Sequence, residues 1–258
     1  MNRDPSDAST WSKVPEITLL FWIIKIAATT LGETGGDAVS MSLHLGYLVG
    51  TAIFGVIFLA AVAAQIRARR FLPFLYWTTI VATTTVGTTL ADFVDRSLHI
   101  GYAGGTSLLV ILLLTSLAVW HRSLGTVSVN TVRSPKEESF YWVTIMFSQT
   151  LGTALGDWTA DTIKFGYAGG AIVFSGLLAL VVAAYFWTKI SRTTLFWAAF
   201  ILTRPLGAVL GDLLDKPVSA GGMALSRFAA SGALVLFIFV CLSFFPQRPA
   251  RAAAHGAD

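Results

Sequence analysis

Residues 21–47 read FWIIKIAATTLGETGGDAVSMSLHLGY, and the landmarks of this stretch recur three more times along the chain. After each aromatic-Trp pair, a glycine follows ten residues beyond the Trp, an aspartate five residues later, and a second glycine nine residues after that. The four sets of Trp, first glycine and aspartate are Trp22, Gly32, Asp37; Trp77, Gly87, Asp92; Trp142, Gly152, Asp157; and Trp197, Gly207, Asp212. Because repetition at fixed offsets indicates repeated structure, the sequence predicts four copies of one unit.

Each unit contains two apolar stretches. The chain has 258 residues, of which 55% are hydrophobic and 12% charged, and its mean hydropathy is +0.70. Such a composition excludes a soluble globular protein, and a transmembrane helix takes about 20 mostly apolar residues. Stretches of this kind lie at 17–42, 46–66, 73–98, 101–120, 139–164, 166–188, 193–215 and 222–245. The predicted fold class is all-α, a polytopic membrane protein of eight transmembrane helices in four parallel two-helix repeats with a pseudo-fourfold arrangement.

The spacing of the tryptophans divides the chain into two halves. Steps of 55, 65 and 55 residues separate the four tryptophans, so the middle step holds extra residues in a polar connection. The predicted segments are a cytoplasmic N-terminal segment at 1–15, repeat 1 at 16–70, repeat 2 at 71–121, a cytoplasmic linker at 122–138, repeat 3 at 139–191, repeat 4 at 192–246 and a cytoplasmic C-terminal tail at 247–258.

The position of the basic residues sets the predicted orientation. Most of the 18 Lys and Arg residues lie at the termini or between repeats, and few lie in the connections within repeats: Arg96, Lys164, Lys216 and Arg227. Since Lys and Arg in short loops stay on the cytoplasmic side, we expect a multi-pass protein of the inner (plasma) membrane with both termini cytoplasmic. The polar opening residues predict no signal peptide. The dispersed charges argue against nucleic-acid binding.

The elements FW or YW, GxxxGD and GYAGG recur over about residues 14–245. In these elements the chain resembles a bacterial family of membrane proteins of unknown function, built from four tandem repeats that each have two transmembrane segments and a tryptophan. The resemblance implies this architecture and no activity. Repeat 4 departs from the pattern, with Pro205 where the other repeats have threonine and AGGM in place of GYAGG. The four repeats are therefore not strictly equivalent.

Small residues mark the packing face of each first helix. Two small residues stand four positions apart there, as at Gly32 and Gly36, and such pairs let helix backbones approach closely in lipid. We predict that four glycines bring the first helices together: Gly32, Gly87, Gly152 and Gly207. The Trp and Tyr residues at the repeat starts, and the tyrosines after the second glycines, are expected to be anchors at the membrane interface.

The repeated aspartates are candidate ligands of a cation. A carboxylate in hydrocarbon is costly and normally faces a bundle interior or a water-filled cavity. Further acids stand one turn away on the same helix faces, so the predicted ligands are Glu33, Asp37, Asp92, Asp95, Asp157, Asp161, Asp212 and Asp215. Oxygen ligands suit Mg²⁺, Ca²⁺ or Mn²⁺, so a bound divalent cation is expected. The alternative is an interfacial or helix-terminating role near the outer surface.

Two basic residues break the repeat symmetry. Arg204 lies two turns from Asp212 on nearly the same face, and Lys25 lies about two turns before Glu33. Each is a candidate counter-ion within the bundle. Arg204, next to Pro205, is also a candidate gating element because proline loosens local hydrogen bonding. The alternative for Lys25 is snorkelling toward the cytoplasmic interface.

These features favour transport of a cation over other functions. The leading hypothesis is a transporter for a divalent metal such as Mn²⁺ or Mg²⁺, or a proton-coupled one, that uses a carboxylate cluster between the four first helices. The alternatives are a cation channel along the pseudo-fourfold axis and a membrane scaffold or sensor. The expected partners are the lipid bilayer and a small cation, with the oligomeric state left open. No enzyme is expected, because no nucleophile stands beside a base.

Overall fold

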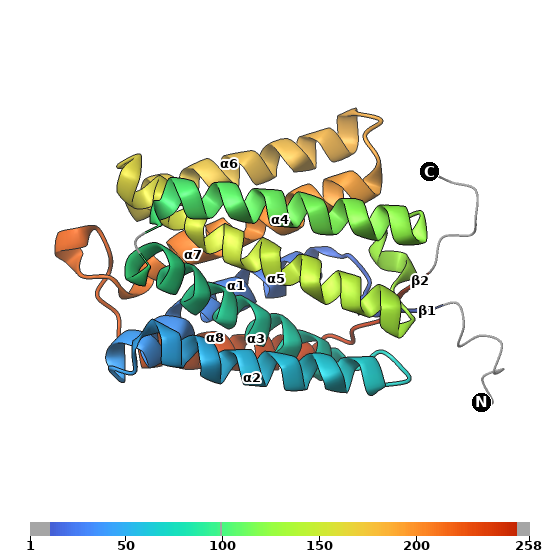
Figure 1. Cartoon of the computed structure of the whole chain (residues 1–258), viewed down its shortest axis with the longest axis horizontal. Coiled ribbons are helices and arrows are strands. Elements are labelled where there is room, and N and C mark those ends of the chain that lie inside the picture. The colour runs from blue at the N-terminus through green and yellow to red at the C-terminus, as the bar shows by residue number, and fades with distance from the viewer. Residues whose placement is uncertain (1–10, 99, 252–258) are drawn as a thin grey trace.

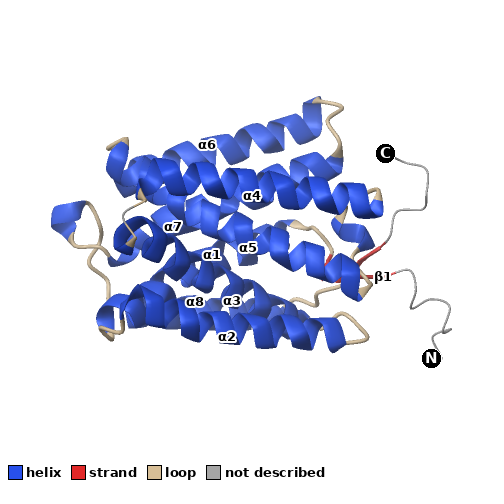
Figure 2. Ribbon diagram, viewed as in Figure 1, coloured by secondary structure: helices blue, strands red, loops and turns tan. Residues whose placement is uncertain are grey.

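A computed structural model describes residues 11–98 and 100–251, and almost all of these residues lie in helices (Figures 1 and 2). Within the described ranges there are eight α-helices and two short strands, β1 (Trp11–Pro15) and β2 (Pro249–Arg251). The α-helices are α1 (Leu19–Asp37), α2 (Gly46–Arg67), α3 (Pro73–Asp92), α4 (Gly101–Leu124), α5 (Pro135–Asp157), α6 (Gly166–Trp187), α7 (Arg192–Asp215) and α8 (Arg227–Phe244). Each predicted apolar stretch corresponds to one helix.

The repeated aspartate ends an α-helix in three of the four repeats. A π-helical segment follows directly in each case: η2 (Ala38–Ser42), η3 (Phe93–Ser97) and η5 (Trp158–Thr162). In repeat 4, α7 instead continues to Asp215, and a 3-10 turn follows at η6 (Val218–Ala220). Isolated π turns are rare and are often found at functional sites. The backbone directly after the aspartate is therefore irregular in repeats 1, 2 and 3.

The second glycine of each repeat turns the chain back into the next helix. Gly46, Gly101, Gly166 and Gly221 all have positive φ values, between 65° and 86°. This left-handed conformation carries no steric penalty for glycine. The fixed position of this glycine in the repeat is therefore explained by the turn between the two helices.

The polar connection in the middle of the chain is shorter than predicted at both ends. α4 continues to Leu124 and stops before Gly125, which has a φ of 76°. α5 begins at Pro135 because Ser134 and Glu137 form a capping box, in which each side chain accepts a hydrogen bond from the backbone of the other. Between the two helices lies one 3-10 turn, η4 (Val129–Thr131).

The first helices of the four repeats form an inner layer. α1 packs against α3 and α7, and α5 packs against the same two helices. The second helices lie outside: α2 on α3, α4 on α5, α6 on α7 and α8 on α1. Each outer helix therefore covers the inner helix of the next repeat, and the last outer helix closes on the first inner helix. Figure 1 shows the helices running side by side along the long axis, with β1 and β2 at one end.

The inner helices approach most closely at the first glycine of each repeat. A Cβ atom at Gly87 would lie only 3.0 Å from the backbone nitrogen of Thr150 on α5. At the three equivalent glycines an added Cβ would overlap a side chain of the next inner helix, in the pairs Gly32 with Thr84, Gly152 with Arg204 and Gly207 with Thr29. The absence of a side chain at this level sets the spacing of the inner layer.

Five helices are long and apolar enough to cross a membrane, counted over the described residues: α2, α4, α6, α7 and α8. In the most apolar 18-residue stretch of each of the four outer helices among them, at most 22% of the residues are buried inside the protein. The corresponding share for α7 is 67%. Large apolar side chains on the outer helices, such as Ile172 and Phe244, are exposed. An apolar exterior of this kind is that of a membrane protein.

An aromatic layer closes the end of the inner helices that lies near β1 and β2. We use this name for the eight side chains of the aromatic-Trp pairs. The expectation that these side chains anchor the protein at the membrane interface was wrong for most of them, since Trp77, Trp142 and Trp197 are buried. They are buried because rings of neighbouring helices pack together, with centroid distances of 5.4 Å (Phe21–Trp77), 5.8 Å (Tyr76–Trp142), 6.4 Å (Tyr141–Trp197) and 5.8 Å (Trp22–Phe196).

Segments distant in sequence cover the aromatic layer. β1 and β2 pair in antiparallel orientation, and β1 also contacts the connection between α4 and α5. Ser12 Oγ donates to the carbonyl of Val129 at 2.7 Å, and Lys13 Nζ lies 2.5 Å from a carboxylate oxygen of Glu138. The two strands and the central connection therefore lie at the same end of the helices.

We expect Gly207→Val to lower the thermal unfolding temperature of the detergent-solubilised protein strongly. The added atoms would overlap Thr29 on α1, and overpacking of this kind costs about 1–3 kcal/mol or more. Gly176→Val is the matched control, because a Cβ at that glycine of α6 meets no atom within 4 Å. Equal unfolding temperatures for the two variants would contradict the role given to the inner glycines.

Candidate functional site

Polar side chains line the contact between the four inner helices from the aromatic layer toward the other end. All of them are at most 3% exposed. Beyond the aromatic layer they form successive levels, which we call together the polar axis: Lys25; then Thr29, Thr84, Gln149 and Arg204; then Glu33, Thr88 and Thr153; and last Asp37, Asp92, Asp157 and Asp212. Buried polar groups inside a membrane protein usually mark an ion or substrate pathway.

Arg204 joins all four repeats at the middle of the polar axis. Its Nη2 atom donates to Glu33 at 3.0 Å, to Thr88 Oγ1 at 2.5 Å and to Thr153 Oγ1 at 2.5 Å. These three acceptors occupy equivalent positions in repeats 1, 2 and 3. One guanidinium from repeat 4 therefore links its own helix to the other three.

The partner of Arg204 differs from the one expected from spacing. The described ion pair of Arg204 is with Glu33 on α1, whereas the sequence pointed to Asp212 on its own helix. Eight residues separate Arg204 from Asp212, which is about 12 Å along a helix. The Glu33 carboxylate, on the other side of the axis, is within hydrogen-bond distance of Arg204 and therefore forms the ion pair.

Two further basic residues bridge the repeated aspartates in pairs. Arg96 Nε lies 2.7 Å from Asp92, and its Nη2 lies 3.1 Å from Asp157. Lys216 Nζ lies 2.9 Å from Asp212 and also pairs with Asp37. Each bridge therefore joins the aspartates of two neighbouring repeats.

Sequence reasoning missed these bridges. It treated Arg96 and Lys216 only as loop charges on the side opposite the termini. Each follows an aspartate of its own helix by four residues, Asp92 or Asp212, which is the spacing of side-chain pairs on one helix face. That spacing was the signal available in the sequence.

The secondary acids have separate positions. Asp215 pairs with Arg227 at 3.0 Å, and the same Arg227 nitrogen lies 3.8 Å from Asp37. Asp95 lies apart from the carboxylate groups described below, and one of its oxygens lies next to Gly105 on α4. The side chain of Asp161 lies outside the part of the structure that is described. Arg227, like the two bridging residues, was not among the predicted site residues.

The carboxylates of the polar axis come together in three overlapping groups. In each group one oxygen per residue lies within 4.8 Å of the others: Glu33, Asp157 and Asp212; Glu33, Asp37 and Asp92; and Asp37, Asp212 and Asp215. The six carboxylates of these groups form ion pairs with four basic side chains among the described residues, those of Arg204, Arg96, Lys216 and Arg227. The carboxylates therefore exceed the basic groups that pair with them by two. Such clustered oxygen donors suit a divalent cation or bound protons.

The two ends of the polar axis differ in access. At the aspartate end, the side chains of Arg96, Arg227 and Lys216 are 34%, 21% and 11% exposed. At the other end the aromatic layer is buried, and the hydroxyls of Tyr76 and Tyr141 are hydrogen-bonded at 2.6 Å. In this conformation, the aspartate end of the polar axis is therefore closer to the protein surface than the end at the aromatic layer.

Lys25 is buried beneath the aromatic layer. Its side chain is 0% exposed, so the alternative, in which it snorkels to the interface, is wrong. It does not pair with Glu33 either. Its Nζ atom lies 4.1 Å from the centre of the Phe200 ring and has no hydrogen-bond partner within the described ranges. The aromatic side chains above it block the way to the surface.

Several polar atoms of the axis lack a protein partner among the described residues. They are Lys25 Nζ, Thr84 Oγ1, both amide atoms of Gln149, and Nε and Nη1 of Arg204. A buried polar group without a partner is costly, and such groups are commonly satisfied by ordered water or a ligand. These atoms lie between the aromatic layer and the level of Glu33, where bound water or a ligand would supply the missing hydrogen bonds.

We expect Arg204→Met to destabilise the protein more than the double variant Arg204→Met with Glu33→Gln. Removing one partner of a buried ion pair leaves an uncompensated charge and costs about 3–5 kcal/mol. Thermal unfolding of both single variants and of the double variant measures the coupling. Strictly additive effects would show that the contact between Arg204 and Glu33 contributes nothing.

We expect Lys25→Met to raise the unfolding temperature and Lys216→Met to lower it. The first change removes a buried ammonium without a described partner, and an unsatisfied buried group costs about 1–3 kcal/mol. The second removes the bridge between Asp37 and Asp212. The two lysines act as controls for each other, and a loss of stability in both variants would contradict this difference.

Comparison with known proteins identifies the repeat. The family described as Repeat of Unknown Function (DUF347) matches residues 20–71, 75–126, 140–191 and 195–248. No curated protein and no solved structure matches the chain. Each matched segment covers one inner helix and the outer helix that follows it. The chain therefore belongs to the DUF347 repeat family, with four copies of the repeat.

Proposed function

We propose that the chain is a membrane transporter for a cation, a divalent metal such as Mn²⁺ or Mg²⁺, or protons coupled to its movement. The observation that carries this proposal is that the six buried carboxylates of the three groups outnumber, by two, the four basic side chains that pair with them. Isolated charges are expensive inside a membrane. A site with two unmatched negative charges is therefore stabilised by a divalent cation or by protons.

The proposal includes eight transmembrane helices in four repeats about a pseudo-fourfold axis. α1, α3 and α5 are less apolar than the five membrane-compatible helices. They are inner helices, each covered by an outer helix of a neighbouring repeat. Their polar side chains face the polar axis instead of lipid, so these helices are able to cross the bilayer in this arrangement.

The basic residues give the site a means of exchange. Lys216 and Arg96 each bridge two aspartates, so they occupy positions where an incoming cation competes for the same oxygens. A cation that enters from the aspartate end displaces a bridging side chain and reaches Glu33. Arg204 then exchanges its contact with Glu33 for other acceptors, which is the role of a gate.

A transporter fits the closed end of the axis better than a permanently open channel does. The aromatic layer and Arg204 both obstruct the axis. Passage requires the aromatic layer to separate, including the contact between Tyr76 and Tyr141. In the proposed orientation in the inner (plasma) membrane, the termini and the aromatic layer are cytoplasmic. The aspartates then face the opposite side.

A scaffold or sensor is the second candidate function. The observation that favours it is that each of the four repeated aspartates has a basic partner. In that case the bridges hold neighbouring repeats together and no ion moves. The two functions differ in flux, and the flux experiment separates them.

We expect purified protein in liposomes to move at least one of Mn²⁺, Mg²⁺, Ca²⁺, K⁺ or H⁺, and the double variant Asp92→Asn, Asp157→Asn to lose this flux. The variant removes two negative charges from the carboxylate groups. Ion-sensitive dyes inside the liposomes measure the flux. Asp95→Asn is the control, because Asp95 lies in the same segment but outside the three groups.

The outcomes are distinct. Loss of flux in the folded double variant, with flux retained in Asp95→Asn, supports carboxylate-based cation transport. No flux of any tested ion in the parent protein, together with poor folding of the double variant, favours the scaffold or sensor.

A further inference from the structure

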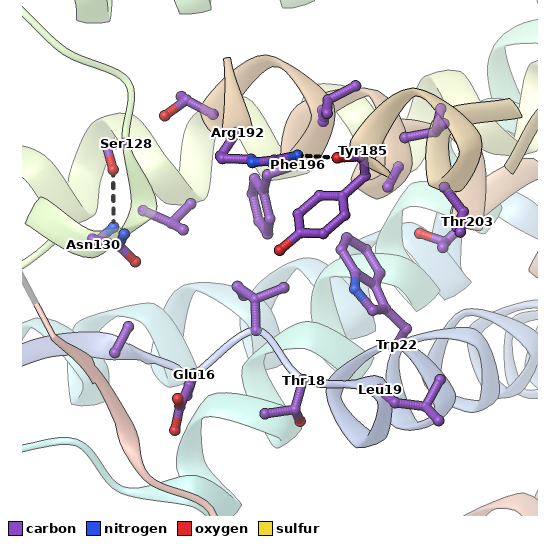
Figure 3. A pocket seen from close by; sticks show the side chains of 18 of the residues that line it. Glu16, Thr18, Leu19, Trp22, Ser128, Asn130, Tyr185, Arg192, Phe196 and Thr203 are labelled. Carbon is purple, nitrogen blue, oxygen red and sulfur yellow. Dashed lines mark hydrogen bonds between the residues drawn. The ribbon is translucent and has the colours of Figure 1, made fainter. Parts of the chain in front are cut away.

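A cavity, which we call the lateral pocket, lies on the side of the helices, away from the carboxylate groups of the polar axis. It has a volume of about 1090 Å³ and lies between α1, α6 and α7 (Figure 3). Its walls are mainly apolar and include Ile26, Leu178, Val182 and Phe196. Figure 3 shows Trp22 and Phe196 directed into the space between the two groups of helices. The cavity therefore presents an apolar surface within the region proposed to lie in the bilayer.

One end of this lateral pocket is polar and mainly basic. Arg192, Arg248 and Arg251 line it together with one acid, Glu16. The guanidinium of Arg192 lies 3.9 Å from the centre of the Tyr185 ring and donates to the Tyr185 carbonyl. This contact holds Arg192 at the rim of the pocket, as Figure 3 shows.

The small sheet positions the other two arginines. β2 begins one residue after Arg248 and ends at Arg251, and the backbone nitrogen of Glu16 donates to the carbonyl of Arg248 at 2.8 Å. Both arginine side chains are exposed. The pocket thus combines a basic group at the end of the helices with an apolar interior along them.

We propose that the lateral pocket binds an anionic phospholipid of the bilayer. The phosphate is held at Arg248 and Arg251, and an acyl chain lies along the apolar walls of α6, α7 and α1. Basic pockets between membrane helices at the cytoplasmic side bind anionic head groups, and arginine matches the geometry of phosphate. This inference rests on the membrane placement of the helices under the proposed function, but not on the identity of the ion.

The bound lipid rests on the junction between the first and last repeats. Trp22 of α1 and Phe196 of α7 line the pocket and also belong to the aromatic layer, with a ring-centroid distance of 5.8 Å. Thr203, another lining residue, accepts a hydrogen bond from Thr29 through its carbonyl at 3.2 Å. The lipid therefore packs against the seam where α1 meets α7 and stabilises the closed aromatic layer.

Quenching of tryptophan fluorescence by brominated lipids tests the proposal. The protein is reconstituted with brominated phosphatidylglycerol or brominated phosphatidylcholine. The difference in quenching between the parent protein and Trp22→Phe reports quenching of Trp22 at the pocket. We expect Trp22 to be quenched more strongly by the anionic lipid. Replacing both arginines, in Arg248→Gln with Arg251→Gln, lowers the preference at least about fivefold, since each basic residue near the surface contributes attraction of that order.

Two further variants make the result decisive. Arg69→Gln with Arg70→Gln is the charge-matched control, because these arginines lie at the same end of the helices but do not line the pocket; it retains the preference. Ala199 also lines the pocket, so Ala199→Phe fills its apolar part and reduces quenching of Trp22 by both lipids. Equal quenching by the two lipids in the parent, or a preference unchanged by the Arg248 and Arg251 substitutions, would overturn the proposal. Cation flux is measured in a separate experiment. Failure of the lipid proposal can therefore be distinguished from failure of the transport proposal.

Discussion

The close approach of four inner helices is the constraint on which the rest of the structure depends. At one level of each inner helix a glycine lies against the next inner helix, and an added Cβ would collide with its neighbour. This spacing brings side chains of four repeats within reach of one another. Arg204 is able to contact Glu33, Thr88 and Thr153 together only because the helices are this close. The close approach of the inner helices also brings the rings of the aromatic layer into contact.

Charge breaks the equivalence that the packing establishes. The scaffold repeats four times, but the residue four positions after the repeated aspartate is Met41, Arg96, Asp161 and Lys216 in turn. Basic residues therefore follow the aspartates of repeats 2 and 4, and each of them bridges to an aspartate of a neighbouring repeat. Arg204 adds a third difference, confined to repeat 4. Repeats that carried the aspartate without these basic residues would place only like charges around the axis, and such charges repel one another.

The two ends of the polar axis differ in the side chains that meet there. Near the strands, aromatic side chains from all four inner helices pack together, and the hydroxyls of Tyr76 and Tyr141 are hydrogen-bonded to each other. At the other end, the basic residues that pair with the buried carboxylates are partly exposed. The lateral pocket borders the closed end at the junction between α1 and α7. In the proposals made above, ions act at one end and a lipid at the other.

The sequence by itself determined the four repeats, the eight helices and the levels of the glycines and aspartates, because these follow from fixed offsets along one chain. The four-residue spacing of Arg96 and Lys216 from an aspartate was also present in the sequence, but it was not recognised there as a pairing signal. Only the tertiary structure decided which groups meet across the axis, that Arg204 pairs with Glu33, and that Lys25 lies under the aromatic layer without a hydrogen-bond partner among the described residues. Those contacts depend on the order of helices around the axis and on the direction each face points. Neither is encoded in the spacing of residues along a single helix.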